Sequence, residues 1–196
     1  TRRFSQITEI TKLMEECKAL KIATLGPDIN ESQIGFGVNK KGEIRFGLAA
    51  IKGMGTSAAE SIVSEREKNG PYKDIYDFAE RVDLSNVNRK AFESLAYSGG
   101  FDSFGLQREQ FFGVSGRDSV FLDTIVRYGQ LFQTEKAEQQ NSLFGGMDAV
   151  AVMHPVAPKT EKWPTIEKLN KERELVGVYL SAHPLDEYSV VLNNMC

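Results

Sequence analysis

Gly53 and Gly55 stand one residue apart, between a short apolar run and a segment with helical spacing. Glycine allows tight turns and close backbone approaches that a side chain would block. In a helix-hairpin-helix, a turn of this form directs the free amides of the second helix outward, where the helix dipole helps them to bind a phosphate. The spacing therefore predicts a helix-hairpin-helix over residues 48–62 that holds a nucleic-acid backbone.

The residues predicted to contact that backbone lie in the turn and in the helix that follows it. Lys52 adds a positive charge, and Met54 fills the gap between the two helices. The predicted set is Lys52, Gly53, Met54, Gly55, Thr56, Ser57, Ala58 and Arg66, with Thr56 or Ser57 as the helix N-cap. Arg66 has the alternative of being a solvated charge at a helix end. Because backbone amides supply much of the contact, binding would not read the base sequence.

The same letters also fit a dinucleotide-binding loop. The run from Gly53 to Ala58 reads G-x-G-x-x-A, and Asp74 follows at a distance that suits a ribose contact. That fold requires a buried strand before the glycines and a second apolar strand leading to the acid, and the letters around Lys52 and Asp74 do not read as such strands. A purely structural turn is the other alternative. The sequence favours phosphate binding over both.

A second candidate binding element is a short peptide in a polar, glycine-rich segment. It consists of Gln140, Asn141, Ser142, Leu143 and Phe144. Adjacent large apolar residues in such a segment are typical of a docking peptide, with Leu143 and Phe144 in a pocket of the partner and the Gln140 amide at its rim. The alternative is that both apolar residues pin the segment to the core of this chain. Spacing alone leaves the two open.

Composition is that of an ordinary globular chain, since 41% of the residues are hydrophobic and 26% are charged. No apolar run reaches the ~20 residues that cross a bilayer, so a cytoplasmic location without a membrane partner is expected. Cys17 and Cys196 form no disulfide framework, which fits a reducing compartment. The net charge is −3, yet residues 39–73 hold seven basic and four acidic side chains. The basic stretch is thus the one that contains the glycine turn.

No spacing in the sequence predicts catalysis or a metal site. No serine, histidine and acid are spaced as a nucleophilic triad would suggest, and His183 has no second metal ligand nearby in sequence. We expect no catalytic residue, metal or cofactor in this chain. The start at Thr1 instead of a methionine and the end at Cys196 favour a piece excised from a longer protein, although N-terminal processing or tag removal would give the same start.

The elements that would carry these residues are mainly helices. Helical spacing of apolar residues predicts helices over 5–21, 56–67, 75–81, 88–97, 106–112, 119–136 and 166–179. Alternating apolar residues on both sides of a turn predict a β-hairpin over 34–48. Residues 77–97 could form a second, degenerate helical hairpin packed on the first. Trp163 is expected to anchor a long loop.

Several short motifs, in a fixed order, resemble the alpha (catalytic) subunit of bacterial DNA polymerase III, a C-family replicative polymerase, in the part after its catalytic palm. They lie within about residues 13–188. The motifs are Gly26-Pro27-Asp28-Ile29-Asn30-Glu31-Ser32, Ile44-Arg45-Phe46-Gly47-Leu48 with Ile51-Lys52-Gly53-Met54-Gly55, Asn88-Arg89-Lys90 with Gly100-Phe101-Asp102, Ser142-Leu143-Phe144-Gly145, and Gly177-Val178-Tyr179-Leu180-Ser181-Ala182-His183-Pro184-Leu185.

The resemblance implies a bacterial cytoplasmic replication protein whose partners are primer-template DNA, the sliding clamp (beta subunit) and, through the full-length chain, other replisome subunits. The helix-hairpin-helix would contact duplex DNA. Residues 140–144 would match a Q-x-x-L-F clamp peptide, with Asn141 at a position where the family often has Leu or Ala. The full-length parent would be a nucleotidyltransferase that uses Mg²⁺, and the resemblance puts its metal-binding aspartates upstream of Thr1. This chain is therefore expected to be non-catalytic.

The predicted fold class is mainly α with a small β-hairpin, a helix-hairpin-helix DNA-binding module plus flanking helices. The chain is divided as follows: 1–33, the helical end of the fingers region; 34–105, the β-hairpin and helix-hairpin-helix domain; 106–137, a helical extension; 138–165, a loop with the clamp peptide; 166–196, a C-terminal helix and turn. A dinucleotide-binding enzyme domain and a purely structural spacer are the alternatives.

Overall fold

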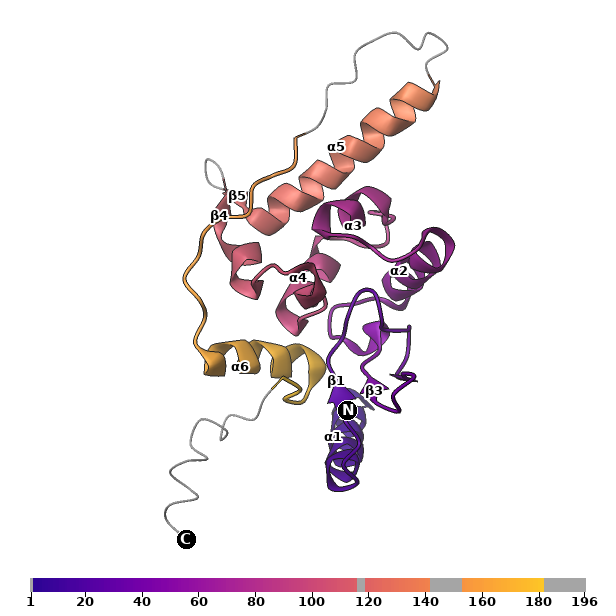
Figure 1. Cartoon of the computed structure of the whole chain (residues 1–196), viewed down its shortest axis with the longest axis vertical. Coiled ribbons are helices and arrows are strands. Elements are labelled where there is room, and N and C mark those ends of the chain that lie inside the picture. Colours follow the sequence, from indigo (N-terminus) through magenta and orange to yellow (C-terminus); the bar gives the residue numbers. More distant parts are fainter. Residues whose placement is uncertain (1, 116–118, 142–152, 182–196) are drawn as a thin grey trace.

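The computed structural model describes three stretches of the chain, residues 2–115, 119–141 and 153–181. The α-helices in these stretches are α1 (Arg2–Ala19), α2 (Thr56–Asn69), α3 (Ile75–Arg81), α4 (Arg89–Ser98), α5 (Phe121–Asn141) and α6 (Thr165–Val176). Helices α2, α3 and α4 lie at the centre, whereas α1 and α5 project from opposite ends (Figure 1). The predicted fold class is confirmed. None of the described helices is long and apolar enough to cross a membrane.

The predicted β-hairpin is present, as part of a three-stranded sheet. Strands β2 (Gly37–Val38) and β3 (Ile44–Arg45) pair antiparallel around a turn in which Asn39 Oδ1 accepts a hydrogen bond from the Glu43 amide at 3.0 Å. Strand β1 (Thr24–Leu25), which was not predicted, pairs parallel with β3 and gives the order β1-β3-β2. A two-residue strand has no alternation to detect, so only its partner reveals it.

The first element of the helix-hairpin-helix is a single 3-10 turn, η1 (Leu48–Ala50), followed by the turn that leads into α2. Leu48 and Ile51 are buried, so tertiary packing stabilises an element too short to be a stable helix alone. Helix α2 begins with Gly55 in the N-cap position and without a side-chain cap, so the predicted Thr56 or Ser57 cap is wrong.

Helices α3 and α4 occupy the region where the sequence allowed a second helical hairpin, but α3 packs mainly against α5 and α4 mainly against α6. The Asp74 carboxylate caps α3 by accepting hydrogen bonds from the amides of Tyr76 and Asp77, each at 2.8 Å. The Asn88 side chain caps α4 in the same way. Gly99, with a φ of +87°, ends α4 in a left-handed conformation. Local capping residues fix these ends, and the predicted bounds hold within one residue.

One hydrophobic core joins elements that are far apart in the sequence. Its largest members include the buried rings of Phe78, Phe92, Phe101, Phe111 and Phe121. The rings of Phe78 and Phe92 meet edge to face at a centroid distance of 5.1 Å. Ile29 and Val176 belong to the same core. Four of the five predicted divisions thus contribute buried residues to it, and their boundaries stay a prediction.

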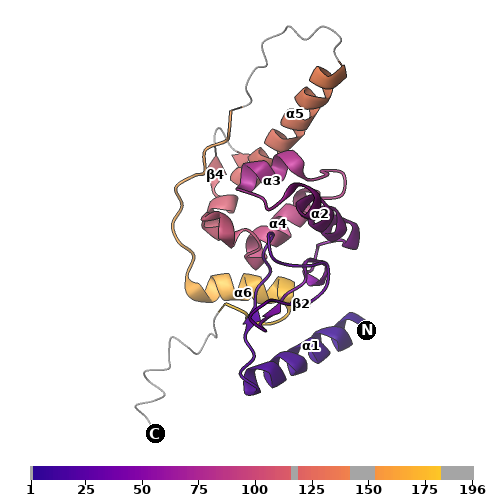
Figure 2. The ribbon, with the colours of Figure 1, turned by 45° about the vertical axis from the view of Figure 1, so that its right-hand side comes forward.

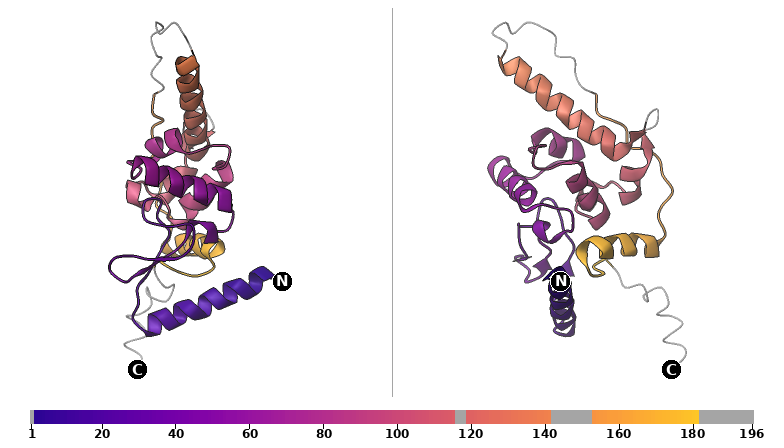
Figure 3. Two further views of the ribbon diagram at one scale, coloured as in Figure 1. Left: turned by 90° about the vertical axis from the view of Figure 1, so that its right-hand side faces the viewer. Right: turned by 180° about the vertical axis from the view of Figure 1, so that it is seen from behind.

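Helix α5 packs closely against α3 and then extends beyond it. A Cβ added at Gly129 would lie 2.6 Å from the Ala79 carbonyl oxygen, so the two helices meet almost backbone to backbone. Four residues later the Gln133 side-chain amide donates a hydrogen bond of 2.8 Å to the Val82 carbonyl oxygen, and beyond it α5 runs away from the body (Figure 3) to Asn141. Residues 138–141, which were predicted to begin the loop, are therefore the last residues of α5. Glutamate and glutamine are good helix formers, and Glu138 and Gln139 prolong the helix.

Residues 153–164, called the strap below, run along one side of the body to α6 (Figure 2). The Tyr76 hydroxyl donates a hydrogen bond to the Pro155 carbonyl oxygen at 2.5 Å. Near the other end of the strap, Trp163 stacks on Tyr97 with 5.7 Å between ring centroids. The predicted anchoring role of Trp163 is thereby confirmed.

Candidate functional site

The turn of the helix-hairpin-helix is held against α4. Gly53 has a φ of +92°, a left-handed conformation that favours glycine. A Cβ added there would lie 2.6 Å from Ser94 Oγ, and the Ser94 hydroxyl donates a hydrogen bond to the Lys52 carbonyl oxygen at 3.1 Å. Gly55 has a φ of −79° and room for a Cβ, which would lie 3.8 Å from Ser57 Oγ. Only Gly53 therefore needs to be glycine on conformational grounds.

The N-terminus of α2 presents its first amides without a side-chain cap. Gly55, Thr56 and Ser57 are exposed, and no side chain in the described stretches caps this helix. Helices α3 and α4, in contrast, are capped by Asp74 and Asn88. The first-turn amides of α2 and the positive end of its dipole thus face solvent. An anion bound there would supply the acceptors that the helix lacks.

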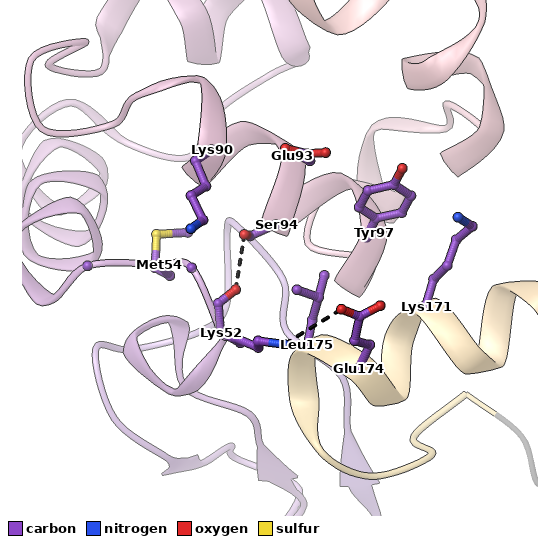
Figure 4. Close-up of a pocket in the computed structure, with 11 residues that line it drawn as sticks. Lys52, Met54, Lys90, Glu93, Ser94, Tyr97, Lys171, Glu174 and Leu175 are labelled. Carbon is purple, nitrogen blue, oxygen red and sulfur yellow. Dashed lines mark hydrogen bonds and ion pairs between the residues drawn. The ribbon is translucent and has the colours of Figure 1, made fainter. Parts of the chain in front are cut away.

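The turn opens into a pocket of about 670 Å³ between the hairpin, α4 and α6 (Figure 4). Three lysines from three elements line it, Lys52 from the turn, Lys90 from α4 and Lys171 from α6. Two carboxylates, Glu93 and Glu174, line it as well. These side chains leave the pocket with one excess positive charge next to the uncapped amides of α2.

Two aromatic rings lie close to Lys171, and one of them, that of Tyr97, lines the pocket. The Lys171 ammonium lies 4.8 Å from the ring centroid of Tyr97 and 4.9 Å from that of Trp163, within the range of cation–π attraction. Burial, with a smaller contribution from the Glu93 charge, raises the pKa of Tyr97, so its hydroxyl stays neutral at physiological pH. This part of the pocket can therefore hold a cation in place but has no titrating phenol.

Helix α6 is fixed to the hairpin domain by a buried ion pair. Arg108 Nη1 donates a hydrogen bond to Glu172 Oε2 at 3.0 Å, and the two side chains are 5% and 1% exposed. Arg108 Nε also donates to Asp102 Oδ1 at 2.9 Å. Glu172 Oε1 accepts from the amides of Leu180 and Ser181, at 2.7 and 2.8 Å. Burial lowers the pKa of Arg108, but hydrogen bonds and charges from Asp102 and Glu172 offset this and raise it above its ordinary value.

The C-terminal end of α6 lies beside the hairpin turn. The helix ends before Gly177, which has a φ of +89°, and so stops three residues short of its predicted end at 179. The Lys52 amide donates a hydrogen bond to the Leu175 carbonyl oxygen at 2.9 Å. The Lys52 ammonium lies 3.6 Å from Glu174 Oε1. The turn is thus held by α4 on one side and by α6 on the other.

Most of the residues predicted to contact a nucleic-acid backbone lie where a ligand could reach them. The exposed members of the set are Lys52, Gly53, Gly55, Thr56 and Ser57. Met54 and Ala58 are 7% and 2% exposed and belong to the core, so only their backbone atoms are candidates for a contact. The structure brings these seven residues together around one helix end. Their contact with DNA stays a prediction.

Arg66 has a structural role instead of the predicted one. It is 8% exposed, and its Nη1 donates hydrogen bonds of 2.8 Å to the carbonyl oxygens of Ile29 and Ser32. Burial lowers the pKa of its guanidinium. Arg66 thus satisfies two carbonyls of a buried loop. The prediction that it contacts DNA is wrong, and so is the alternative of a solvated charge.

The dinucleotide-binding alternative does not fit the structure. The residues before Gly53 form the 3-10 turn η1, not a buried strand. Asp74, the proposed ribose ligand, uses its carboxylate to cap α3. Neither the strand that leads into the glycines nor the free acid of that fold is present at these positions.

The sequence did not predict that α6 and α4 contribute side chains to this pocket. Lys90 and Lys171 line the pocket, and Arg108 and Glu172 hold α6 in place, but none of them was predicted to have these roles. Two of the motifs that carry the family resemblance pointed to part of this region. One contains Lys90, and the other contains Asp102, the second carboxylate partner of Arg108.

The docking peptide falls largely outside the part of the chain that the structure describes. Gln140 and Asn141 are the last residues of α5, and Ser142, Leu143 and Phe144 are not described. The peptide therefore stays a prediction. Across the described stretches, no group of three or more His, Cys, Asp or Glu side chains is arranged to hold a metal ion.

Comparisons with known proteins agree with this geometry. The family model described as "Helix-hairpin-helix motif" matches residues 21–111, which include η1, the turn, α2, α3 and α4. The chain is 36% identical over 183 residues to the protein named DNA polymerase III subunit alpha from Xylella fastidiosa, covering 92% of this chain and 15% of that relative. It is 39% identical over 190 residues to the protein of the same name from Chlamydia trachomatis, covering 93% of this chain and 14% of the relative. The Vibrio cholerae relative of that name is 34% identical over 181 residues, with 92% and 15% covered.

Proposed function

The chain belongs to the family of bacterial DNA polymerase III alpha subunits, of which it spans about one seventh of the length, and from this premise we propose that it binds duplex DNA during replication. In this proposal the ligand is the phosphate backbone of primer-template DNA. The contacts come from the Lys52 to Ala58 segment. Base sequence plays no part, because amides and ammonium groups at a phosphate carry no base information.

The observation that carries the proposal is the uncapped N-terminus of α2 beside the left-handed glycine turn. Helices α3 and α4 satisfy their first amides with their own side chains, whereas α2 leaves its amides exposed next to Lys52. A backbone phosphate placed there would accept hydrogen bonds from the amides and would meet the positive end of the dipole. The Lys52 side chain is 62% exposed, and its ammonium would add a direct ion pair.

The wider activity of the relatives is also proposed for the full-length protein. Their name describes a DNA polymerase, and we propose that the parent of this chain is a DNA-directed nucleotidyltransferase whose metal-binding aspartates and Mg²⁺ lie outside this segment. This segment would then position DNA without carrying out phosphoryl transfer. Other replisome subunits would bind through the rest of the full-length chain.

Replacement of Lys52 by Glu tests the DNA-binding proposal. We expect affinity for a fluorescent duplex, measured by anisotropy at low salt, to fall about tenfold, and the salt dependence of log Kd to lose a slope of about one, because one phosphate contact is lost. Two duplexes of unrelated sequence should bind the unmodified chain within about twofold of each other.

Lys68→Glu is the matched control for this test. It makes the same change in net charge on an exposed residue near the opposite end of α2, a helix of 14 residues and so about 21 Å long. The two variants are also compared at about 0.1 M salt, where a Debye length of ~10 Å screens most of the effect of Lys68 on a phosphate at the helix start. Equal loss of affinity in both variants would mean that net charge, not the hairpin, governs binding.

We further propose that residues 140–144 bind the sliding clamp. The support is the peptide itself, Q-x-x-L-F in form, together with the position of Gln140 and Asn141 at the tip of a helix that runs clear of the body (Figure 3). Leu143 and Phe144 would be the anchors of this contact.

A double substitution of both anchors tests the clamp proposal. Leu143→Ala/Phe144→Ala should weaken retention on immobilised clamp at least thirtyfold, because the loss of even one such anchor costs on the order of 2 kcal/mol or more. Leu131→Ala, which removes an apolar side chain that is 51% exposed on the same helix, should leave retention unchanged. Equal retention of the double variant and the unmodified chain would favour the alternative of a structural spacer.

A further inference from the structure

Lys52, the cation of the proposed phosphate site, is already paired with an anion from a distant part of the sequence. Its ammonium lies 3.6 Å from Glu174 Oε1. The two side chains are 62% and 72% exposed and both line the pocket in front of the turn (Figure 4). A phosphate that approaches Lys52 therefore enters a space next to a carboxylate.

The position of Glu174 is set by the fold rather than by the ion pair. The Lys52 amide donates to the Leu175 carbonyl oxygen at 2.9 Å, so the residue after Glu174 is tied to the turn. Two residues before Glu174, the buried Glu172 pairs with Arg108. Glu174 thus lies between two fixed points of α6 and stays close to Lys52 whether or not the pair forms.

The end of α6 adds to the negative charge at this place. The last turn of a helix presents carbonyl oxygens and the negative end of its dipole. In this structure that end meets the turn that precedes the positive end of α2. One helix end thus attracts a phosphate and the other repels it, within a single pocket.

From this juxtaposition we propose that Glu174 is an affinity-determining residue that competes with the DNA phosphate for Lys52. The inference rests on the proposed DNA-binding function. Bound phosphate displaces the Glu174 carboxylate from the ammonium, so part of the attraction between Lys52 and DNA is spent on breaking the existing pair. The consequence is weaker and more readily reversible binding of the phosphate at this site.

The competition is large enough to measure. Exposed ion pairs contribute little to stability, so breaking the pair should leave the fold intact. A negative charge held about 4 Å from a phosphate-binding ammonium still opposes binding at low ionic strength. Glu174→Gln should therefore tighten duplex binding about fivefold at low salt, and this gain should shrink as salt is added.

A double-mutant cycle separates competition from a general effect of charge. Glu174→Gln is measured alone and in the Lys52→Gln background, with anisotropy of the same labelled duplex and with the full 196-residue chain. Competition for Lys52 predicts a gain of about fivefold in the first case and of no more than about twofold in the second. Glu138→Gln, an equal change in charge on the exposed outer part of α5, should alter affinity by less than about 1.5-fold.

The results distinguish failure of the proposed DNA-binding function from failure of the inference about Glu174. If the unmodified chain shows no salt-dependent duplex binding, the proposed function fails and the inference falls with it. If the chain binds and Lys52→Gln weakens binding, the function stands, and the inference is overturned by a Glu174→Gln variant with unchanged affinity. Equal gains in both backgrounds would also overturn it, because Glu174 would then act without Lys52. Thermal unfolding of every variant checks that the fold is retained.

Discussion

Replacing Arg108 by Met is expected to lower the free energy of unfolding by about 3–5 kcal/mol, a large share of the roughly 5–15 kcal/mol that stabilises a typical domain. Arg108 is 4% exposed and Glu172 is 1% exposed. Removal of the guanidinium leaves the Glu172 carboxylate buried without a counter-charge, and methionine can supply no hydrogen bond. The Asp102 carboxylate loses its partner too, but it can turn to solvent because it is 45% exposed.

The loss of stability should affect α6 and the strap first. Trp163 is the one tryptophan of the chain, and it stacks on Tyr97 immediately before α6. Its fluorescence therefore reports whether α6 is docked, whereas circular dichroism reports total helix content. In the Arg108→Met variant we expect the fluorescence transition in urea to precede the dichroism transition. In the unmodified chain the two transitions should coincide.

Arg89→Met is the control, since Arg89 also pairs with two carboxylates. Its Nε lies 2.7 Å from Asp123 and its Nη1 lies 2.8 Å from Glu93, but the side chain is 49% exposed. Exposed pairs of this kind contribute about 0–1 kcal/mol. Similar destabilisation by both substitutions would show that burial of the Arg108 pair has no special role in holding α6.

Elements set by neighbouring residues could be predicted from the sequence. Asp74, Asn88 and Gly99 cap α3 and α4 with side chains or backbone angles that act within a few positions, so the bounds of both helices were predicted within one residue. The hairpin turn was recognised for the same reason, because the φ of +92° at Gly53 is a local requirement for glycine.

Features that depend on distant partners could not be predicted. The Arg108–Glu172 pair joins residues 64 positions apart, and no local pattern links them. Arg66 has the same sequence context as a solvated helix-end cation, and only the carbonyls of Ile29 and Ser32, 37 and 34 positions away, turn it inward. The candidate site was thus predicted on its α2 side and missed on its α6 side, where Glu174 and Lys171 come from more than a hundred positions away.

Gly53→Ala is expected to have the largest effect on DNA binding, with a loss of affinity of at least tenfold and a loss of stability of about 2–3 kcal/mol. A left-handed backbone costs an L-residue about 1–2 kcal/mol. The new Cβ would also lie 2.6 Å from Ser94 Oγ, so the contact between the turn and α4, with its hydrogen bond from Ser94 to the Lys52 carbonyl oxygen, must shift. That movement shifts the start of α2 and Lys52, the two sources of the proposed phosphate contacts.

Gly42→Ala separates the conformational cost of a side chain at positive φ from the steric cost of the contact with Ser94. Gly42 has a φ of +80°, similar to that of Gly53, but a Cβ there would meet nothing within 4 Å. This substitution should lose only the conformational part, about 1–2 kcal/mol, and should leave DNA affinity unchanged. Gly55→Ala, with a φ of −79° and no close neighbour, should be tolerated in both assays.

A second-site change tests the steric part of the argument directly. Ser94→Ala removes the atom that the new Cβ would strike, at the cost of one hydrogen bond of about 1 kcal/mol to the Lys52 carbonyl oxygen. The Gly53→Ala/Ser94→Ala variant should therefore be more stable than the sum of the single losses predicts, and it should regain part of the DNA affinity. Strictly additive losses would show that the Cβ added by Gly53→Ala does not clash with Ser94. A normal DNA affinity in a folded Gly53→Ala protein would show that the turn does not place the phosphate contacts.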